Sequence, residues 1–407
     1  MNLISFILPS RNNLKYLKQA YESIRKNSEH QHEICIASDA STDGTVEWVQ
    51  EIMKEDVNVK LHINEGPERL GHTILYDTLV YDYATHDRVM IFHADMYLCP
   101  NADEEIDKLL EPGKVISLTR IEPPLHPPGP EKILCDYGIE PEEFMEEALL
   151  NWIEVEGSSV ANEKYTEGIF APWCIMKDDF TRIHGHDPLF APQSKEDSDI
   201  FNRFMLAGYE FIETWQGYVY HMTCRGSRFK DGAVRNPDGE VFMKNRETDE
   251  WLTQNMKSTR NFIRKWGSMV VHNEYLKPII PPKYDIGLVV ENCNNSDMLA
   301  TLEPYCNQIY LKEDKLFQDY IDSEQPNCRY DLGAKLVTLE INPFNDVLIY
   351  FDASKLNNEN FQRIFLNFPR ILEESGEPDS DFELDIFGVK IKTLDNQVDT
   401  LVNSVCK

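Results

Sequence analysis

The sequence predicts an α/β protein with a mostly parallel sheet, followed by a second, smaller α/β domain. Over the first hundred residues, short apolar runs alternate with segments of helical spacing, which is typical of βαβ units. The same alternation starts again near residue 284, just after the proline-rich sequence PIIPP. A chain of 407 residues is also too long for one average core. We therefore expect two domains, residues 1–278 and residues 279–407.

The elements of the first half follow one another in a regular order. Apolar runs predict the strands, and apolar residues at helical spacing predict the helices between them. Thr42 and Asp43 are residue types that cap helices, so they predict where the second helix starts. The expected elements are strands at residues 3–8, 33–37, 57–63 and 88–92, and helices at residues 14–25, 42–55 and 73–84.

The rest of the first domain is less regular. The proline-rich stretch at residues 122–132 cannot enter a sheet interior, so it is either a linker or one wall of a substrate cleft. An acidic helix is expected at residues 140–156 and a strand at residues 169–176. A further strand, residues 217–220, ends at His221.

The second domain is predicted to be a small acidic α/β unit of unknown role. It contains no glycine-rich phosphate loop. The expected elements are strands at residues 285–293, 307–313 and 346–354, helices at residues 295–306 and 360–374, and a hairpin or edge pair at residues 382–394.

Charge and composition exclude several classes of partner. The formal net charge is -30, which argues against a face that binds the phosphates of nucleic acid. The chain has no long apolar run and no charged-then-apolar leader, so we expect a soluble, cytoplasmic protein without a membrane span. Nine cysteines without a CxxC pair indicate reduced, buried thiols rather than disulfides or a zinc site.

Polar residues follow three of the predicted strands. Ser10 and Arg11 come after the first strand, Asp39 after the second, and His93 and Asp95 after the fourth. Ligands of parallel α/β sheets bind outside the carboxyl ends of the strands. His93 and Asp95 are two positions apart, so in an extended segment they share one side and can hold one ligand between them. Strand ends are often polar, but three such sets at one edge indicate a binding site.

These segments resemble the family 2 glycosyltransferases with the GT-A fold. FILPSRNN is similar to the family's opening strand and loop, and ASDASTDGT to its nucleotide-binding turn. FHADMYL resembles the strand end that carries the family's DxD motif. GHDPLFAPQSKEDSDIFNRF resembles the region of the catalytic acid, and RKWG resembles a motif that occurs late in the domain. The resemblance covers roughly residues 3–267, and the order of the motifs is more specific than any one of them.

The resemblance implies a nucleotide-diphosphate-sugar donor, with UDP-sugar as the first choice. Asp39 is suited to accept a hydrogen bond from the imide of uracil. Arg69 is similar to a cation that the family directs at the pyrophosphate or base, and a guanidinium suits phosphate oxygens; an ordinary surface arginine is the alternative. The residues expected to bind the donor are Pro9, Ser10, Arg11, Asp39, Arg69, His93, Ala94 and Asp95.

HAD resembles a DxD in which His93 replaces the first acid. In the family the last acid binds a divalent ion, so the resemblance makes Asp95 a metal ligand, with His93 near the ribose or outside the first coordination shell. His221 matches a histidine that the family often adds as a ligand, and a core histidine is the alternative. The expected ion is Mn2+ or Mg2+, and imidazole favours manganese.

The resemblance assigns the catalytic base to Asp197 in KEDSD, with Glu196 orienting or contacting the acceptor. The alternative is that these acids decorate a helix N-terminus, where the helix dipole favours them. Trp173 is either an aromatic platform for an acceptor sugar or a core residue.

The predicted function is an inverting, metal-dependent transfer of a sugar from a nucleotide diphosphate to a glycan or another hydroxyl acceptor. The second candidate, favoured by His93, is an inactive nucleotide-sugar or glycan-binding protein with the same fold. A nucleotidyltransferase would need a glycine-rich basic N-terminal loop, which FILPSRNN lacks. The second domain is also a possible surface for homo-oligomers.

Overall fold

The chain folds as two compact units in the computed structural model. Unit 1 comprises residues 1–254 and 272–278, and unit 2 comprises residues 255–271 and 279–407. Helix α9 (Asp249–Trp266) therefore begins in unit 1 and ends in unit 2. The assignment of separate roles to residues 1–278 and 279–407 stays a prediction. The structure describes residues 2–157, 164–226, 228–245 and 247–405.

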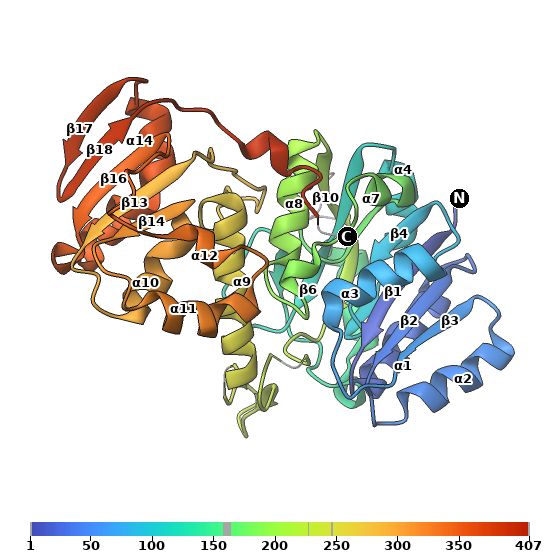
Figure 1. Cartoon of the computed structure of the whole chain (residues 1–407). Helices are drawn as coiled ribbons and strands as arrows, with labels where there is room; N and C mark the ends of the chain where they lie inside the picture. The colour runs from blue at the N-terminus through green and yellow to red at the C-terminus, as the bar shows by residue number, and fades with distance from the viewer. Residues whose placement is uncertain (1, 158–163, 227, 246, 406–407) are drawn as a thin grey trace. The chain divides into compact units, whose positions relative to one another are not determined.

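The first part of unit 1 has the predicted alternation of strands and helices (Figure 1). Four parallel strands lie in the order β3-β2-β1-β4. The third α-helix ends at Thr78, earlier than predicted. A π-helix follows it directly over Leu79–Tyr83. The elements are β1 (Ile4–Ser10), α1 (Leu14–Asn27), β2 (Glu33–Asp39), α2 (Thr45–Glu55), β3 (Val59–Asn64), α3 (Gly71–Thr78) and β4 (Arg88–Ile91).

Both faces of this sheet are covered. On β1, Phe6 and Leu8 pack in one core cluster with Leu17 of α1, whereas Ile7 packs in the opposite cluster with Leu75 of α3. Successive side chains of a strand point to opposite faces, so an unbroken apolar run suits a strand that is buried on both sides. With both faces occupied by core, the open strand ends are where a ligand can bind.

The second part of the sheet is mixed rather than uniformly parallel. β9 lies antiparallel between β4 and β6, and β10 lies between β6 and β5. The sequence analysis predicts no strand at β6, and it predicts only the last residues of β10. The bounds are β5 (Met96–Leu98), α4 (Ala102–Leu109), β6 (Lys114–Glu122), β7 (Lys132–Leu134), α5 (Glu146–Trp152), β8 (Tyr165–Thr166), β9 (Trp173–Met176), α7 (Lys177–Arg182), α8 (Glu196–Leu206), β10 (Glu210–His221), β11 (Ala233–Arg235) and β12 (Val241–Met243).

Unit 2 is a second α/β fold, which confirms the predicted fold class. Its sheet has the order β15-β14-β13-β16-β18-β17, and β17 and β18 form the predicted hairpin. The helix predicted at residues 360–374 is interrupted, because Pro369 starts a new helix and cannot continue the previous one. The bounds are β13 (Ile286–Glu291), α10 (Ser296–Leu302), β14 (Gln308–Leu311), α11 (Phe317–Glu324), α12 (Leu332–Lys335), β15 (Leu336–Thr338), β16 (Val347–Asp352), α13 (Asn358–Arg363), α14 (Phe368–Ser375), β17 (Ser380–Leu384) and β18 (Phe387–Ile391).

A buried ion network holds the end of α9 within unit 2. The guanidinium of Arg264 has no exposed surface and donates to Glu303 at 2.6 Å and to Glu324 at 2.8 Å. Lys335 pairs with the same Glu303 carboxylate at 2.5 Å. The RKWG segment, which contains Arg264, is therefore a packing element of unit 2.

Replacing Glu303 with alanine should lower the free energy of unfolding by about 3–5 kcal/mol, because it leaves the buried charges of Arg264 and Lys335 uncompensated. Urea denaturation of the full chain measures the change. The control is Glu359→Ala, which breaks an exposed pair with Arg363 and should leave the unfolding midpoint almost unchanged. Equal midpoints for the two variants would contradict a stabilising role for the network.

Two further expectations concern the whole chain. No helix among the described residues is long and apolar enough to cross a membrane. The cysteines that the structure describes are free thiols; five of them are buried as expected, and Cys135, Cys293 and Cys328 are half-buried.

Candidate active site

The ends of β1 and β2 carry the first residues of the predicted donor pocket. Ser10 and Ser38 are paired in register, both are buried, and neither hydroxyl has a hydrogen-bond partner among the described residues. A buried polar group without a partner costs about 1–3 kcal/mol. A ligand that supplies those hydrogen bonds would therefore bind favourably at this edge of the sheet. Pro9 lies at the same edge, because it precedes Ser10 in β1.

Asp39 anchors the start of α3. One carboxylate oxygen accepts from the Asn64 amide at 2.8 Å and from the Leu70 backbone N–H at 3.0 Å. The other accepts from the Gly71 backbone N–H at 2.9 Å. Three of the about four acceptor positions of this carboxylate are therefore filled, and Nε of Arg69 lies 3.7 Å from the oxygen that accepts from Gly71. Recognition of a base by Asp39 stays a prediction, while its contact with α3 is present without any ligand.

Asp43 accepts hydrogen bonds at the starts of two helices. Its carboxylate accepts from the backbone N–H of Thr45, the first residue of α2, at 3.2 Å and from that of Leu14, the first residue of α1, at 2.8 Å. Asp43 is not itself an N-cap, since the N-cap residues are Gly44 for α2 and Asn13 for α1. Its carboxylate nevertheless accepts from the first backbone N–H of both helices, which is a structural role.

Arg69 is not an ordinary surface arginine. Its side chain is only 12% exposed, and it donates to the Gln193 side chain at 2.8 Å. Arg69 lines a cavity of about 290 Å³ together with Glu250 and Trp251. Burial and the like charge of Arg11 lower the pKa of Arg69. Two guanidinium groups close enough to repel each other are suited to bind an anion between them.

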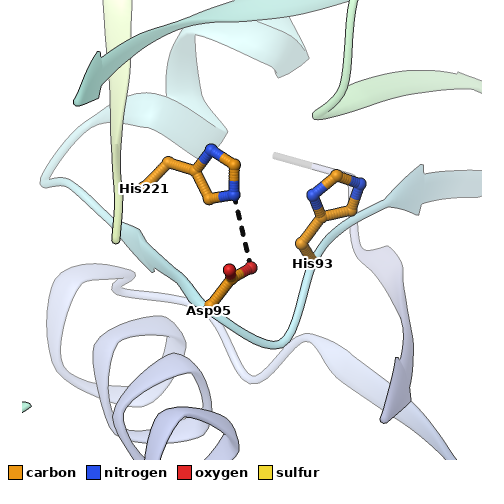
Figure 2. Close-up of side chains that lie close together, drawn as sticks. All are labelled: His93, Asp95 and His221. Carbon is orange, nitrogen blue, oxygen red and sulfur yellow. Dashed lines mark ion pairs between the residues drawn. The ribbon is translucent and has the colours of Figure 1, made fainter. Parts of the chain in front are cut away.

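The strand register assembles a cluster around His221, the last residue of β10. β10 lies between β5 and β6, and His221 pairs with Met96 of β5. The imidazole therefore lies between Asp95 and Glu122: Nε2 is 3.3 Å from an oxygen of Asp95, and Nδ1 is 2.7 Å from an oxygen of Glu122. Figure 2 shows the ion pair between His221 and Asp95.

His93 and Asp95 converge through a turn. The Met96 backbone N–H donates to the His93 carbonyl at 3.2 Å, so the prediction that the two residues share one side of an extended segment is wrong. The turn nevertheless brings both to His221, with Ala94 buried between them. One ligand atom from each of His93, Asp95 and His221 lies within 4.8 Å of the others (Figure 2).

The charges of this cluster suit a divalent cation. Burial alone would raise the pKa of Asp95, but His221 and His93 lower it to about 2. Burial alone would lower the pKa of His221, but Asp95 and the Glu122 carboxylate raise it to about 9. In the absence of metal a proton thus sits where a cation can replace it. Two imidazole nitrogens and one carboxylate oxygen suit Mn2+ better than Mg2+, which prefers oxygen ligands.

The predicted catalytic acids start helix α8. Glu196 is 8% exposed, and its Oε2 atom has no hydrogen-bond partner among the described residues. Burial raises the pKa of Asp197, and burial together with the negative charge of Asp197 raises that of Glu196. A carboxylate with a raised pKa is better matched to proton transfer near neutral pH.

A later acid of the same motif is structural. Asp199 and Arg203 form a fully buried ion pair at 2.9 Å. Arg203 also donates to the backbone carbonyls of Ile183 at 2.7 Å and Gly185 at 2.6 Å. This pair therefore fixes the turn that follows α7, so Asp199 has a structural role.

The structure adds residues that the sequence analysis does not predict. His186 Nδ1 lies 2.7 Å from an oxygen of Asp77, and its Nε2 is buried without a partner among the described residues. The ring of His186 is 5.6 Å from that of Tyr76, centroid to centroid. Tyr76 and Asp77 carry no signal in the sequence, since each is an ordinary residue of a helical stretch.

Tyr76 lies near the candidate metal ligands. The phenol is 2% exposed. Burial raises its pKa most, and the charges of Asp197, Glu196 and Asp95 raise it further. Ring contacts lead from Tyr76 through His72 to His93, with centroids 5.6 and 6.3 Å apart, so Tyr76 lies close to the candidate metal ligands. That Asp197 belongs to the same site stays a prediction.

Trp173 does not belong to the site. It is fully buried and packs against Phe180 and Phe204 with ring centroids 6.4 and 5.8 Å away. The interpretation as an acceptor platform is wrong, and the alternative of a core tryptophan is confirmed.

Comparisons with solved structures give distant likenesses. The structure of GalNAc-T7 with UDP, GalNAc and Mn2+ has 12% identity and a TM-score of 0.45, over 65% of this chain and 49% of that one. The mannosyltransferase PcManGT from Pyrobaculum calidifontis in complex with GDP-Man and Mn2+ has 17% identity and a TM-score of 0.39, over 55% and 58%. S. aureus TarS 1-349 has 14% identity and a TM-score of 0.38, over 54% and 60%. The chain thus spans about half to three fifths of the length of these proteins.

The comparison with protein families gives a more direct result. No curated protein matches the chain. Residues 5–126 match the family described as Glycosyl transferase family 2, and this range contains β1 to β6 with the strand ends at Ser10, Asp39 and Asp95. The likeness to glycosyl transferase family 2 is thus a match over residues 5–126, the first part of unit 1.

Proposed function

We propose that the protein is an inverting, metal-dependent glycosyltransferase that moves a sugar from UDP to a hydroxyl group of a glycan or another acceptor. The observation that carries this proposal is the cluster of His93, Asp95 and His221, in which one ligand atom of each residue lies within 4.8 Å of the others. A donor diphosphate and an acceptor hydroxyl must lie on opposite sides of the transferred sugar; the cluster is proposed to serve the first, and Glu196 with Asp197 the second.

The donor pocket is proposed at the ends of β1 and β2. Ser10 and Ser38 offer hydroxyls that lack partners among the described residues. Arg11 and Arg69 carry the positive charge that a diphosphate requires. The remaining acceptor position of Asp39 suits the imide N–H of uracil, which is why UDP is proposed rather than another nucleotide.

The residues of the cluster fit a divalent ion, with His93, Asp95 and His221 as its ligands. When bound, the ion supplies a Lewis acid that offsets the charge of the departing diphosphate. Asp197 accepts the proton of the acceptor hydroxyl as its oxygen attacks the sugar, and Glu196 orients that hydroxyl. Attack from the side opposite the leaving group inverts the anomeric centre.

The test is calorimetric titration of the full chain with UDP, with and without Mn2+, followed by UDP release from a panel of UDP-sugars. We expect UDP binding that depends on Mn2+ and release from at least one donor. CDP serves as the matched control and should bind more weakly, since N3 of cytosine carries no proton that it could donate to Asp39. Binding of UDP with the same affinity in EDTA would contradict the metal assignment.

A second candidate remains, because His93 stands where the family pattern has an acid. It is a nucleotide-sugar or glycan-binding protein without activity. Mn2+-dependent UDP binding with no release from any donor, at any acceptor concentration, would favour this candidate. A cytoplasmic location and a homo-oligomer through unit 2 stay predictions.

A further inference from the structure

Glu122, the last residue of β6, touches the candidate metal site without being one of its predicted ligands. Its side chain is 1% exposed, and its Oε1 atom lies 2.7 Å from Nδ1 of His221. The other ring nitrogen of His221, Nε2, lies 3.3 Å from Asp95. The imidazole is therefore held on one side by Glu122 and presents its other side to the cluster.

Two cations hold Glu122 in place. Arg120 lies 3.2 Å from one carboxylate oxygen and Lys132 lies 3.3 Å from the other. The same two cations contact Glu131 at 2.9 and 3.4 Å. A buried carboxylate is costly unless it is paired and hydrogen-bonded, and these contacts meet that condition. The carboxylate is thus fixed before any metal binds.

We propose that Glu122 is a positioning residue for the metal site, which fixes the orientation and tautomer of His221. A neutral imidazole carries one proton, and the hydrogen bond made by one nitrogen decides which nitrogen remains free. With its proton on Nδ1 and donated to Glu122, His221 offers the Nε2 lone pair toward Asp95 and His93. This inference rests on the proposed function only in taking His221 as a metal ligand.

Another interpretation is that Glu122 only neutralises Arg120 and Lys132. Glu131 provides the matched control, because it contacts the same two cations but has no contact with His221 among the described residues. Glu122→Gln and Glu131→Gln therefore remove the same charge next to the same cations, and only the first changes the group that faces the imidazole.

The experiment measures Mn2+ binding to the full chain by electron paramagnetic resonance, without nucleotide or acceptor. Glu122→Gln replaces a charged acceptor with a neutral amide and should weaken Mn2+ binding about 10–100-fold, the usual effect of mutating the hydrogen-bond partner of a metal-bound histidine. Glu131→Gln should leave Mn2+ affinity unchanged. Equal affinities for Glu122→Gln and the wild-type protein would overturn the role of Glu122 and leave the proposed function standing. A wild-type protein that binds no Mn2+ would overturn both.

A second measurement needs no variant, so it stands even if Glu122→Gln fails to fold. In the protein loaded with Zn2+ as a diamagnetic probe, 15N NMR of the histidine rings should place the proton of His221 on Nδ1 and the metal on Nε2. A proton on Nε2 in the loaded protein would overturn the proposal.

Discussion

Replacing Asp197 with asparagine is expected to lower kcat for sugar transfer by about 10²–10⁴-fold, the range that a positioned general base contributes. The amide has nearly the same shape as the carboxylate but cannot take the proton of the acceptor hydroxyl. Donor binding should change little, because the proposed donor pocket lies at the ends of β1 and β2. Steady-state UDP release and UDP calorimetry measure the two effects separately.

The control for Asp197 is an acid that only decorates a helix start. Asp178 is exposed and lies in the first turn of α7, so Asp178→Asn should leave kcat unchanged. If Asp197→Asn behaved like Asp178→Asn, Asp197 would be a helix-end acid and the base would have to be sought elsewhere, first at Glu196.

The pH profile tests the same assignment. Burial raises the pKa of Asp197, and a base works in its deprotonated form, so kcat should rise with pH through a value above the ordinary aspartate pKa of about 3.9. Burial and the charge of Asp197 raise the pKa of Glu196 to about 8, so Glu196 is still protonated while Asp197 titrates. Glu196→Gln should therefore leave the rising limb of kcat at the same pH, whatever its effect on the maximum rate, and a shifted limb would mean that Glu196 is the base.

The sequence predicts the first part of the fold well because the signals there are local. The strands β1, β2 and β4 are largely apolar and buried throughout, and a strand buried on both faces requires such a run. The rule that ligands bind at strand ends then selects Asp39 and Asp95 without further information. The same rule applied to the short run before His221 finds that residue as well.

The position of Glu122 could not be predicted in this way, because it depends on strand β6, which the sequence does not predict. In β6, apolar Val115, Ile116 and Leu118 are interrupted by polar Ser117 and Thr119. The strand is then followed at once by the proline-rich stretch, so Glu122 reads as the start of a loop. Only pairing with β9 and β10, far along the chain, makes the segment a strand and brings its last residue to His221.

Ion pairs that only the structure reveals also change how a motif is interpreted. Asp197 and Asp199 are two positions apart in one motif and look alike in the sequence. The structure distinguishes the two residues, because Asp199 forms a buried ion pair with Arg203. Likewise, Arg264 belongs to a motif that recurs in the family, yet its partners Glu303 and Glu324 lie outside the segment that resembles the family.

The other large effect on activity is expected for Asp95→Ala, because Asp95 is a proposed ligand of the metal ion. This variant removes the only carboxylate among the three candidate ligands His93, Asp95 and His221. Loss of a Lewis acid removes several kcal/mol of transition-state stabilisation, so kcat/KM for the donor should fall about 10³-fold. Mn2+ binding by electron paramagnetic resonance should weaken in parallel, and UDP binding should lose its dependence on Mn2+.

His93→Asp is the informative control, because it restores the acid of the family pattern and keeps Asp95. Replacing an imidazole with a carboxylate makes the ligand set harder, so the variant should still bind a divalent ion but shift its preference from Mn2+ toward Mg2+. Thermal denaturation of both variants checks that the fold is intact. If Asp95→Ala bound UDP with an unchanged requirement for Mn2+, Asp95 would not be a ligand and HAD would not act as the DxD of this protein.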